Sequence, residues 1–113
     1  MAKVEIVDSL QNEVHKKFKE ESVIVFKHMK SLEENPLKGK FLCRLAGVDV
    51  KELKYKSFRF YFLVEGNLLR FFDSKTLSEL LIRFVRMSNK KEQQKTINEI
   101  RELLLKIGVE GFS

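Results

Sequence analysis

The segment FRFYFLV, residues 58–64, decides the fold because aromatic and other side chains alternate along it. A β-strand points successive side chains to opposite faces of a sheet. One face of this strand is expected to carry Phe58, Phe60, Phe62 and Val64. The other face is expected to carry Arg59, Tyr61 and Leu63. A continuous aromatic face must be buried, so helices from elsewhere in the chain are expected to cover it.

The sequence around this strand predicts further strands. Segments rich in Phe, Tyr, Val and Leu predict them at residues 41–46, 50–56, 68–72 and 80–87. Gly66 and Asn67 tolerate positive φ, so they predict a tight turn between residues 58–64 and 68–72. Residues 73–78 are expected to form a loop or one helical turn.

Upstream of residue 40, apolar residues recur mainly at helical spacing. Two helices are expected over residues 9–20 and 22–34, and Pro36 is expected to end the second because proline cannot continue a helix. Before them, residues 3–7 alternate polar and apolar side chains, which predicts a short strand.

The C-terminal segment predicts a final helix over residues 90–107. Asn89 and Glu92 have the spacing of a capping box at its start, and Gly108 is placed to end it. The elements together predict an α+β fold, in which an N-terminal strand and two helices pack on an antiparallel sheet of about four strands, with a C-terminal helix. The helices are expected to form a layer on one sheet face. With 113 residues and no obvious linker, the chain is expected to be a single domain, residues 1–113.

Positive charge is concentrated in the middle of the chain. There are 22 Lys and Arg against 16 Asp and Glu, a net charge of +6 with a pI near 9.5. Residues 38–91 alone carry a net charge of +8, whereas the segment on either side carries −1. Such a block attracts polyanions by counterion release and long-range steering. The alternative interpretation is a charged surface that only keeps the protein soluble.

Composition narrows the classes of protein further. A hydrophobic content of 43% is enough for a packed core. No apolar run reaches the roughly 18 residues of a membrane span, and the N-terminus lacks the apolar region of a secretory signal. The single cysteine, Cys43, favours a reduced, cytoplasmic location. His15, His28 and Cys43 lack the spacing of metal ligands, and no phosphate-loop motif is present, so no metal or other cofactor is expected.

Basic and aromatic residues are the candidate functional groups. If their strands are neighbours, Lys54, Arg59, Tyr61 and Arg86 converge on one surface. Cations hold phosphates while rings stack on bases, so the pattern favours binding of RNA or single-stranded nucleic acid. A fixed guanidinium also stabilises the charge that develops when a 2′-hydroxyl attacks a phosphate. The alternative is that each Arg is only the polar side of an alternating strand. A wider RNA- or ribosome-binding surface is expected from Lys38, Lys40, Arg44, Lys51, Lys56, Arg83, Ser88, Lys90 and Lys91.

Two segments carry an ordered set of short motifs: LEENPLKGKFLCRLAGVDVKELKYKSFRFYFLVEGN (32–67) and IRFVRMSNKKEQQKTINEIRELL (82–104). They resemble the RelE/ParE superfamily of bacterial and archaeal toxins, and the resemblance covers about residues 30–107. It implies a RelE-like toxin of a type II toxin–antitoxin system, an mRNA interferase that cleaves transcripts on the ribosome. It also implies contacts with ribosomal RNA and a cognate antitoxin, bound at residues 90–107 and at the sheet face near Arg59. Neither a membrane nor a small-molecule cofactor is implied.

The resemblance assigns roles to four residues. Lys54 takes the basic position of the family's "ELR" motif, and Arg59 matches the Arg of "yRIyY", where it would bind or polarise the scissile phosphate. Tyr61 matches an aromatic residue of that strand and could stack on a base. Arg86 takes the first basic position of "FVKKS", beside Ser88.

The chain also departs from the family pattern. Met87 replaces the second Lys of "FVKKS", the proline that opens the last helix is missing, and residues 69–80 look inserted into a short hairpin. Neither His nor Tyr follows Arg86, so the terminal acid or base of some members is absent and nuclease activity could be weakened. Two alternatives follow: a ParE-like toxin that acts on DNA gyrase without cleaving nucleic acid, or a diverged RNA-binding domain without catalysis.

Overall fold

The computed structural model describes residues 2–72 and 75–113, with side chains described outside 66–79. Its strands and helices, in chain order, are β1 (Ala2–Ile6), α1 (Asp8–Phe18), α2 (Ser22–Lys30), β2 (Lys40–Leu45), β3 (Val48–Tyr55), β4 (Phe58–Phe72), β5 (Lys75–Asn89) and α3 (Gln93–Lys106). Short 3-10 turns follow the three helices at Lys19–Glu21, Ser31–Glu33 and Val109–Gly111. No helix among the described residues is both long and apolar enough to cross a membrane.

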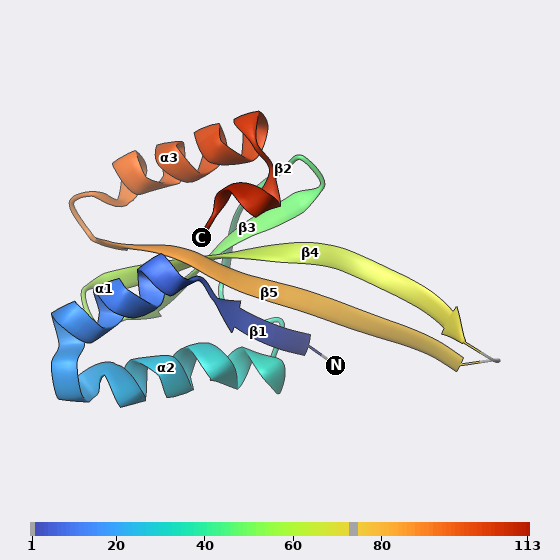
Figure 1. Cartoon of the computed structure of the whole chain (residues 1–113), viewed down its shortest axis with the longest axis horizontal. Helices are drawn as coiled ribbons and strands as arrows, with labels where there is room; N and C mark the ends of the chain where they lie inside the picture. Colours follow the sequence, from blue (N-terminus) through green and yellow to red (C-terminus); the bar gives the residue numbers. More distant parts are fainter. Residues whose placement is uncertain (1, 73–74) are drawn as a thin grey trace.

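The strands form one sheet in the order β1-β5-β4-β3-β2 (Figure 1). β2 to β5 are antiparallel neighbours, whereas β1 runs parallel to β5 at the edge of the sheet. The predicted α+β class is therefore confirmed, but the sheet has five strands and is mixed, not a four-stranded antiparallel sheet. β1 joins the sheet by pairing with residues 80–84 of β5, and the two helices that follow it lead the chain to the opposite edge, where β2 begins.

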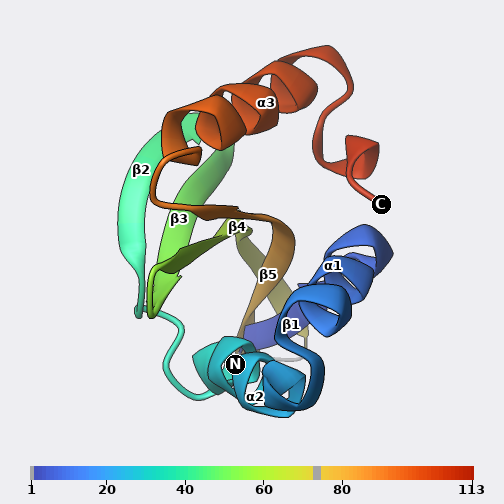
Figure 2. The ribbon, with the colours of Figure 1, turned by 90° about the vertical axis from the view of Figure 1, so that its left-hand side faces the viewer.

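Helices cover both faces of the sheet, which corrects the predicted single helix layer (Figure 2). α1 and α2 pack on the face that carries Phe60 and Phe62. α3 packs Ile100 and Leu104 on the other face. Both sides of β4 carry apolar residues, so each face needs its own cover. The alternation predicted for residues 58–64 is confirmed, and it gives the protein two cores that share one sheet.

The predicted turn at Gly66 and Asn67 is wrong. β4 continues to Phe72, and the pairing of β4 with β5 changes register between Glu65 and Leu68. A bulge thus takes the place of a turn, because the strand-forming residues beyond it still pair with β5. Residues 75–78, predicted as loop or helical turn, belong to β5, while 73–74 lie outside the described residues.

The predicted ends of the last helix are confirmed in part. The predicted start is wrong: α3 begins at Gln93 with Glu92 as its N-cap, and the Asn89 Oδ1, which accepts the Glu92 N–H at 2.9 Å, lies before the helix, at the end of β5. Gly108 has φ +86° and donates its N–H to the carbonyls of Leu103 and Leu104 at 3.2 and 3.1 Å. A glycine adopts this left-handed conformation without a Cβ clash, so α3 ends where predicted.

Gly39 is where the chain turns into the sheet, and it is expected to tolerate no side chain. Its φ is +108°, and a Cβ there would lie 2.8 Å from the Phe62 Cζ. Gly47 also has positive φ, at +78°, but a Cβ there meets nothing within 4 Å. Gly39→Ala should therefore destabilise the protein by at least about 1 kcal/mol more than Gly47→Ala. Urea unfolding of both variants measures the difference; equal losses would show that the packing at Gly39 is not tight.

Candidate functional site

The register of the sheet brings the four candidate catalytic residues together on the α3 face. Lys54 pairs with Arg59, which in turn pairs with Ser88 across β4 and β5. In the neighbouring row, Tyr61 of β4 pairs with Arg86 of β5. Residues paired across strands share a face of the sheet. Segments separated by about thirty residues in sequence thus meet on one face of the sheet, as the strand pattern predicted.

A buried carboxylate that the sequence analysis did not single out lies inside this group. Glu52 of β3 pairs with both Lys40 and Tyr61. Its Oε1 lies 3.9 Å from the Arg59 Nε, and only 12% of the Arg59 side chain and 8% of the Glu52 side chain are exposed. The Gln93 side chain, from the first turn of α3, donates to the Glu52 Oε2 at 3.0 Å. Arg59 therefore lies beside a carboxylate that α3 helps to hold.

Tyr61 is fully buried, so its ring is not available to stack on a base in this structure. Its hydroxyl lies 2.8 Å from the Ser88 hydroxyl, which is also buried. Burial raises the pKa of Tyr61, and the Ser88 hydrogen bond opposes that rise. Tyr61 and Ser88 therefore form an uncharged, buried hydrogen-bonded pair within the site.

Arg86 is held by groups from several elements. Its Nε donates to the Glu99 carboxylate of α3 at 3.0 Å, and its Nη1 donates to the Val85 carbonyl at 2.7 Å. The guanidinium also stacks over the Phe112 ring, 5.1 Å from the centroid. Glu99 and Phe112 were not predicted as site residues. Like Arg59, Arg86 thus has a carboxylate partner within the protein.

Several residues predicted for the wider surface lie away from this site. Arg44 is paired with Asp49 beside the β2–β3 turn at 2.8 Å, and Lys56 is paired with Glu21. Lys51 lies over the Phe62 ring on the opposite face of the sheet.

Other residues predicted for the wider surface lie nearer to the site or link neighbouring elements. Arg83 reaches Glu5 of β1 at 3.4 Å and the Val109 carbonyl at 3.3 Å, so it links β5 to both neighbouring segments. Lys90 and Lys91 are exposed in the turn between β5 and α3, directly after Ser88 and Asn89.

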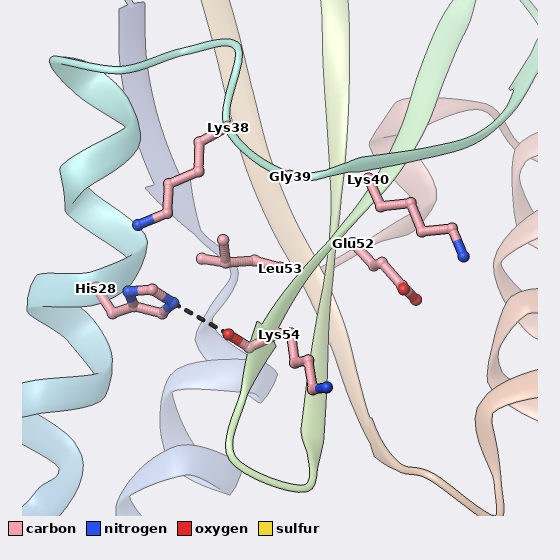
Figure 3. Close-up of a pocket in the computed structure, with 7 residues that line it drawn as sticks. All are labelled: His28, Lys38, Gly39, Lys40, Glu52, Leu53 and Lys54. Carbon is pink, nitrogen blue, oxygen red and sulfur yellow. Dashed lines mark hydrogen bonds between the residues drawn. The ribbon is translucent and has the colours of Figure 1, made fainter.

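A pocket of about 330 Å³ opens beside the site at the start of β2 (Figure 3). We call it the edge pocket; it is lined by His28, Lys38, Gly39, Lys40, Glu52, Leu53 and Lys54. Figure 3 shows Lys40, Glu52 and Lys54 pointing to one side of the strands, and His28 and Lys38 lying on the other. The edge pocket therefore connects the α3 face to the α2 side through the sheet edge.

The site has the groups needed to bind a phosphodiester. Lys40 and Lys54 are exposed cations, and Arg59 adds a guanidinium that holds a fixed position. A carboxylate such as Glu52 accepts a proton from a hydroxyl that it contacts. Among the described residues, no group of three or more His, Cys, Asp or Glu side chains is arranged to hold a metal ion.

Glu13 of α1 lies near Arg86 and Glu99, and its pKa departs from the ordinary value of a glutamate. Glu13 is exposed as a residue, but partial desolvation of its carboxyl raises its pKa above the ordinary 4.5; attraction to Arg86 and Lys17 opposes the rise, and Glu99 adds to it. A carboxyl whose pKa is raised by folding contributes stability at low pH and loses it as pH rises through the folded-state pKa. Glu13→Gln should therefore raise the free energy of unfolding at neutral pH, and the gain should vanish below pH 4.5.

Urea unfolding at several pH values tests this expectation. Glu20→Gln, which removes a carboxylate from the turn after α1, is the control for the loss of one negative charge. A gain for Glu13→Gln that is the same at every pH would contradict the burial argument.

The chain was also compared with known proteins. It matches no protein-family model, and it has no significant match among curated proteins or among solved structures.

Proposed function

We propose that this protein is a RelE-like toxin of a type II toxin–antitoxin system, an mRNA interferase that cleaves transcripts on the ribosome. The observation that carries the proposal is the register of β3, β4 and β5. It places Lys54, Arg59 and Arg86, three positions that resemble the family's basic residues, on one face of the sheet. The order of elements, from an N-terminal strand to a C-terminal helix, also supports a RelE-like fold.

The proposed reaction is cleavage by the neighbouring 2′-hydroxyl of the RNA. Glu52 takes the proton from this hydroxyl, and the 2′-oxygen bonds to phosphorus while the bond to the 5′-oxygen breaks. Arg59 stabilises the charge that develops on the phosphate oxygens. Lys54 gives a proton to the departing 5′-oxygen, in the role that His or Tyr fills in some family members. The Gln93 amide donates to the Glu52 Oε2, so RNA that binds at this oxygen must displace that amide.

The ion pairs of the site favour a second candidate function. Arg59 and Arg86 each lie beside a carboxylate, and Tyr61 is buried. A site whose charges are already paired suits a ParE-like toxin, which would inhibit DNA gyrase through a protein interface and cleave no RNA. Under either proposal the toxin acts in the cytoplasm, and a cognate antitoxin would bind α3 and the sheet face near Arg59.

Induced expression in a bacterium tests the two candidates together. The leading proposal predicts growth arrest with broken transcripts and no DNA-damage response. It also predicts that Arg59→Ala and Arg86→Ala abolish the arrest while the protein remains folded. A DNA-damage response with intact transcripts would select the gyrase inhibitor. Full toxicity of both variants would show that the proposed site is wrong.

A further inference from the structure

The sheet has an uncovered backbone segment beside the start of β2. The last residue pair of β2 with β3 is Lys40 with Glu52, yet β3 continues to Tyr55. The chain before Lys40 leaves the sheet at Gly39, where φ is +108°. Within the described part of the chain, residues 53–55 of β3 therefore pair with β4 on one side and have no strand on the other.

The opposite edge of the sheet is closed by side chains. At β1, the Val4 N–H donates to the Glu33 carboxylate at 3.0 Å, and the Val4 carbonyl accepts from the Lys30 ammonium at 2.9 Å. At residues 53–55, the side chain that reaches the strand is His28, whose Nε2 lies 3.2 Å from the Lys54 carbonyl at an exposed position. A carbonyl oxygen has two lone pairs, so this contact leaves room for a second donor.

The edge pocket lies at this uncovered segment. Figure 3 shows His28 on α2 facing the backbone of Lys54, with the Leu53 side chain between α2 and the strand. The volume of this pocket is about 330 Å³. The pocket thus lies in line with β2, where a further strand would continue the sheet.

The rim of the edge pocket combines positive charge with exposed apolar side chains. Among the described residues, Lys38, Lys40 and Lys54 form no ion pair, although seven such pairs occur elsewhere. Two apolar neighbours in the same loop and strand are largely exposed: Leu37 at 84% and Phe41 at 55%. Exposed apolar residues interleaved with cations are typical of a surface that binds an acidic protein segment.

We propose that the edge pocket docks an extended, acidic peptide segment of a partner protein, which adds as a short strand beside residues 53–55. The segment would donate to the Lys54 carbonyl, place acidic side chains against Lys38 and Lys54, and pack apolar ones on Leu37 and Phe41. RNA is a poorer occupant of this strand edge, because its backbone has no regularly spaced N–H donors to pair with residues 53–55. The proposal does not depend on RNA cleavage, but a peptide bound here would compete with RNA for Lys54.

Selection from a display library of short random peptides against the full chain tests the proposal. Selected peptides should alternate acidic with apolar residues, and peptide binding should slow amide exchange at Lys54. The double variant Lys38→Glu/Lys54→Glu should weaken binding by about tenfold or more. Methylation of alternate backbone amides of the peptide should also abolish binding, since strand addition needs those donors.

The matched control is Lys16→Glu/Lys95→Glu, which makes the same charge change at exposed positions on α1 and α3 and should leave peptide affinity unchanged. If charge reversal unfolds the protein, Lys38→Gln/Lys54→Gln replaces it. The proposal is wrong if no peptide is selected, if selected peptides are not acidic, or if both double variants bind them equally. Loss of affinity for a short single-stranded RNA, without peptide binding, would assign the edge pocket to the RNA site.

Discussion

Replacing Arg59 with alanine is expected to lower the rate of transcript cleavage by about a hundredfold or more, as the loss of a fixed charge-stabilising donor does in other enzymes. Arg59 lies at the centre of the site, between Lys54 on β3 and Ser88 on β5. Its side chain is mostly buried, so the guanidinium holds a fixed position and needs little reorganisation when charge develops on the phosphate. The rate of cleavage of a ribosome-bound transcript measures the effect.

Because Arg59 is paired with the buried Glu52, the Arg59→Ala experiment needs a control for folding. Removing one member of a buried ion pair leaves the other charge unpaired and destabilises the native state. The double variant Arg59→Ala/Glu52→Gln avoids an unpaired Glu52 charge and is used only to compare folding stability, because Glu52 is also the proposed base. Arg101→Ala, which removes an exposed Arg from α3, is the control for cleavage. Cleavage should be lost in Arg59→Ala and retained in Arg101→Ala. Normal cleavage by folded Arg59→Ala would remove Arg59 from the mechanism.

Replacing Phe62 with alanine is expected to lower the free energy of unfolding by about 3 to 5 kcal/mol, the range for a large buried aromatic side chain. Phe62 is fully buried, and its ring lies 4.9 Å from the Phe84 ring on the neighbouring strand. It also packs under Gly39, so the α2–β2 loop loses a contact as well.

The exposed Phe41 provides a matched control for this core substitution. Phe41→Ala removes the same atoms from a side chain that is 55% exposed, so its effect should be below about 0.5 kcal/mol. Urea unfolding of both variants gives the comparison. Similar losses at the two positions would mean that the aromatic face of β4 is not the principal core.

The central strand could be predicted from sequence because its alternation is a local signal. Residues 58–64 place their aromatic side chains on one face whatever surrounds them. The number of helix layers has no such local signal in the sequence. It depends on whether a helix covers the face of β4 that carries Tyr61, and that face mixes Arg59 with apolar residues. The turn predicted at Gly66 was wrong for a related reason, since pairing with β5 beyond Glu65 outweighs a local turn preference.

For the candidate site, the sequence could predict which residues share a face of a strand, and nothing more. Lys54, Arg59 and Arg86 do share a face, as predicted. The partners of these cations depend on how α3 docks, and no local pattern encodes it. Gln93 reaches Glu52 only because the first turn of α3 lies over β3. The burial of Tyr61 follows from the same packing, which the alternation of one strand does not reveal.

The most direct test of the proposed function is sequencing of RNA ends in a purified translation system. With wild-type protein, we expect breaks within the transcript that carry 5′-hydroxyl ends, that appear only when translating ribosomes are present, and that disappear with Arg59→Ala. Transcripts that stay intact in this system, at the protein concentration found in growth-arrested cells, would contradict the assignment of this sheet face as an RNA-cleaving site.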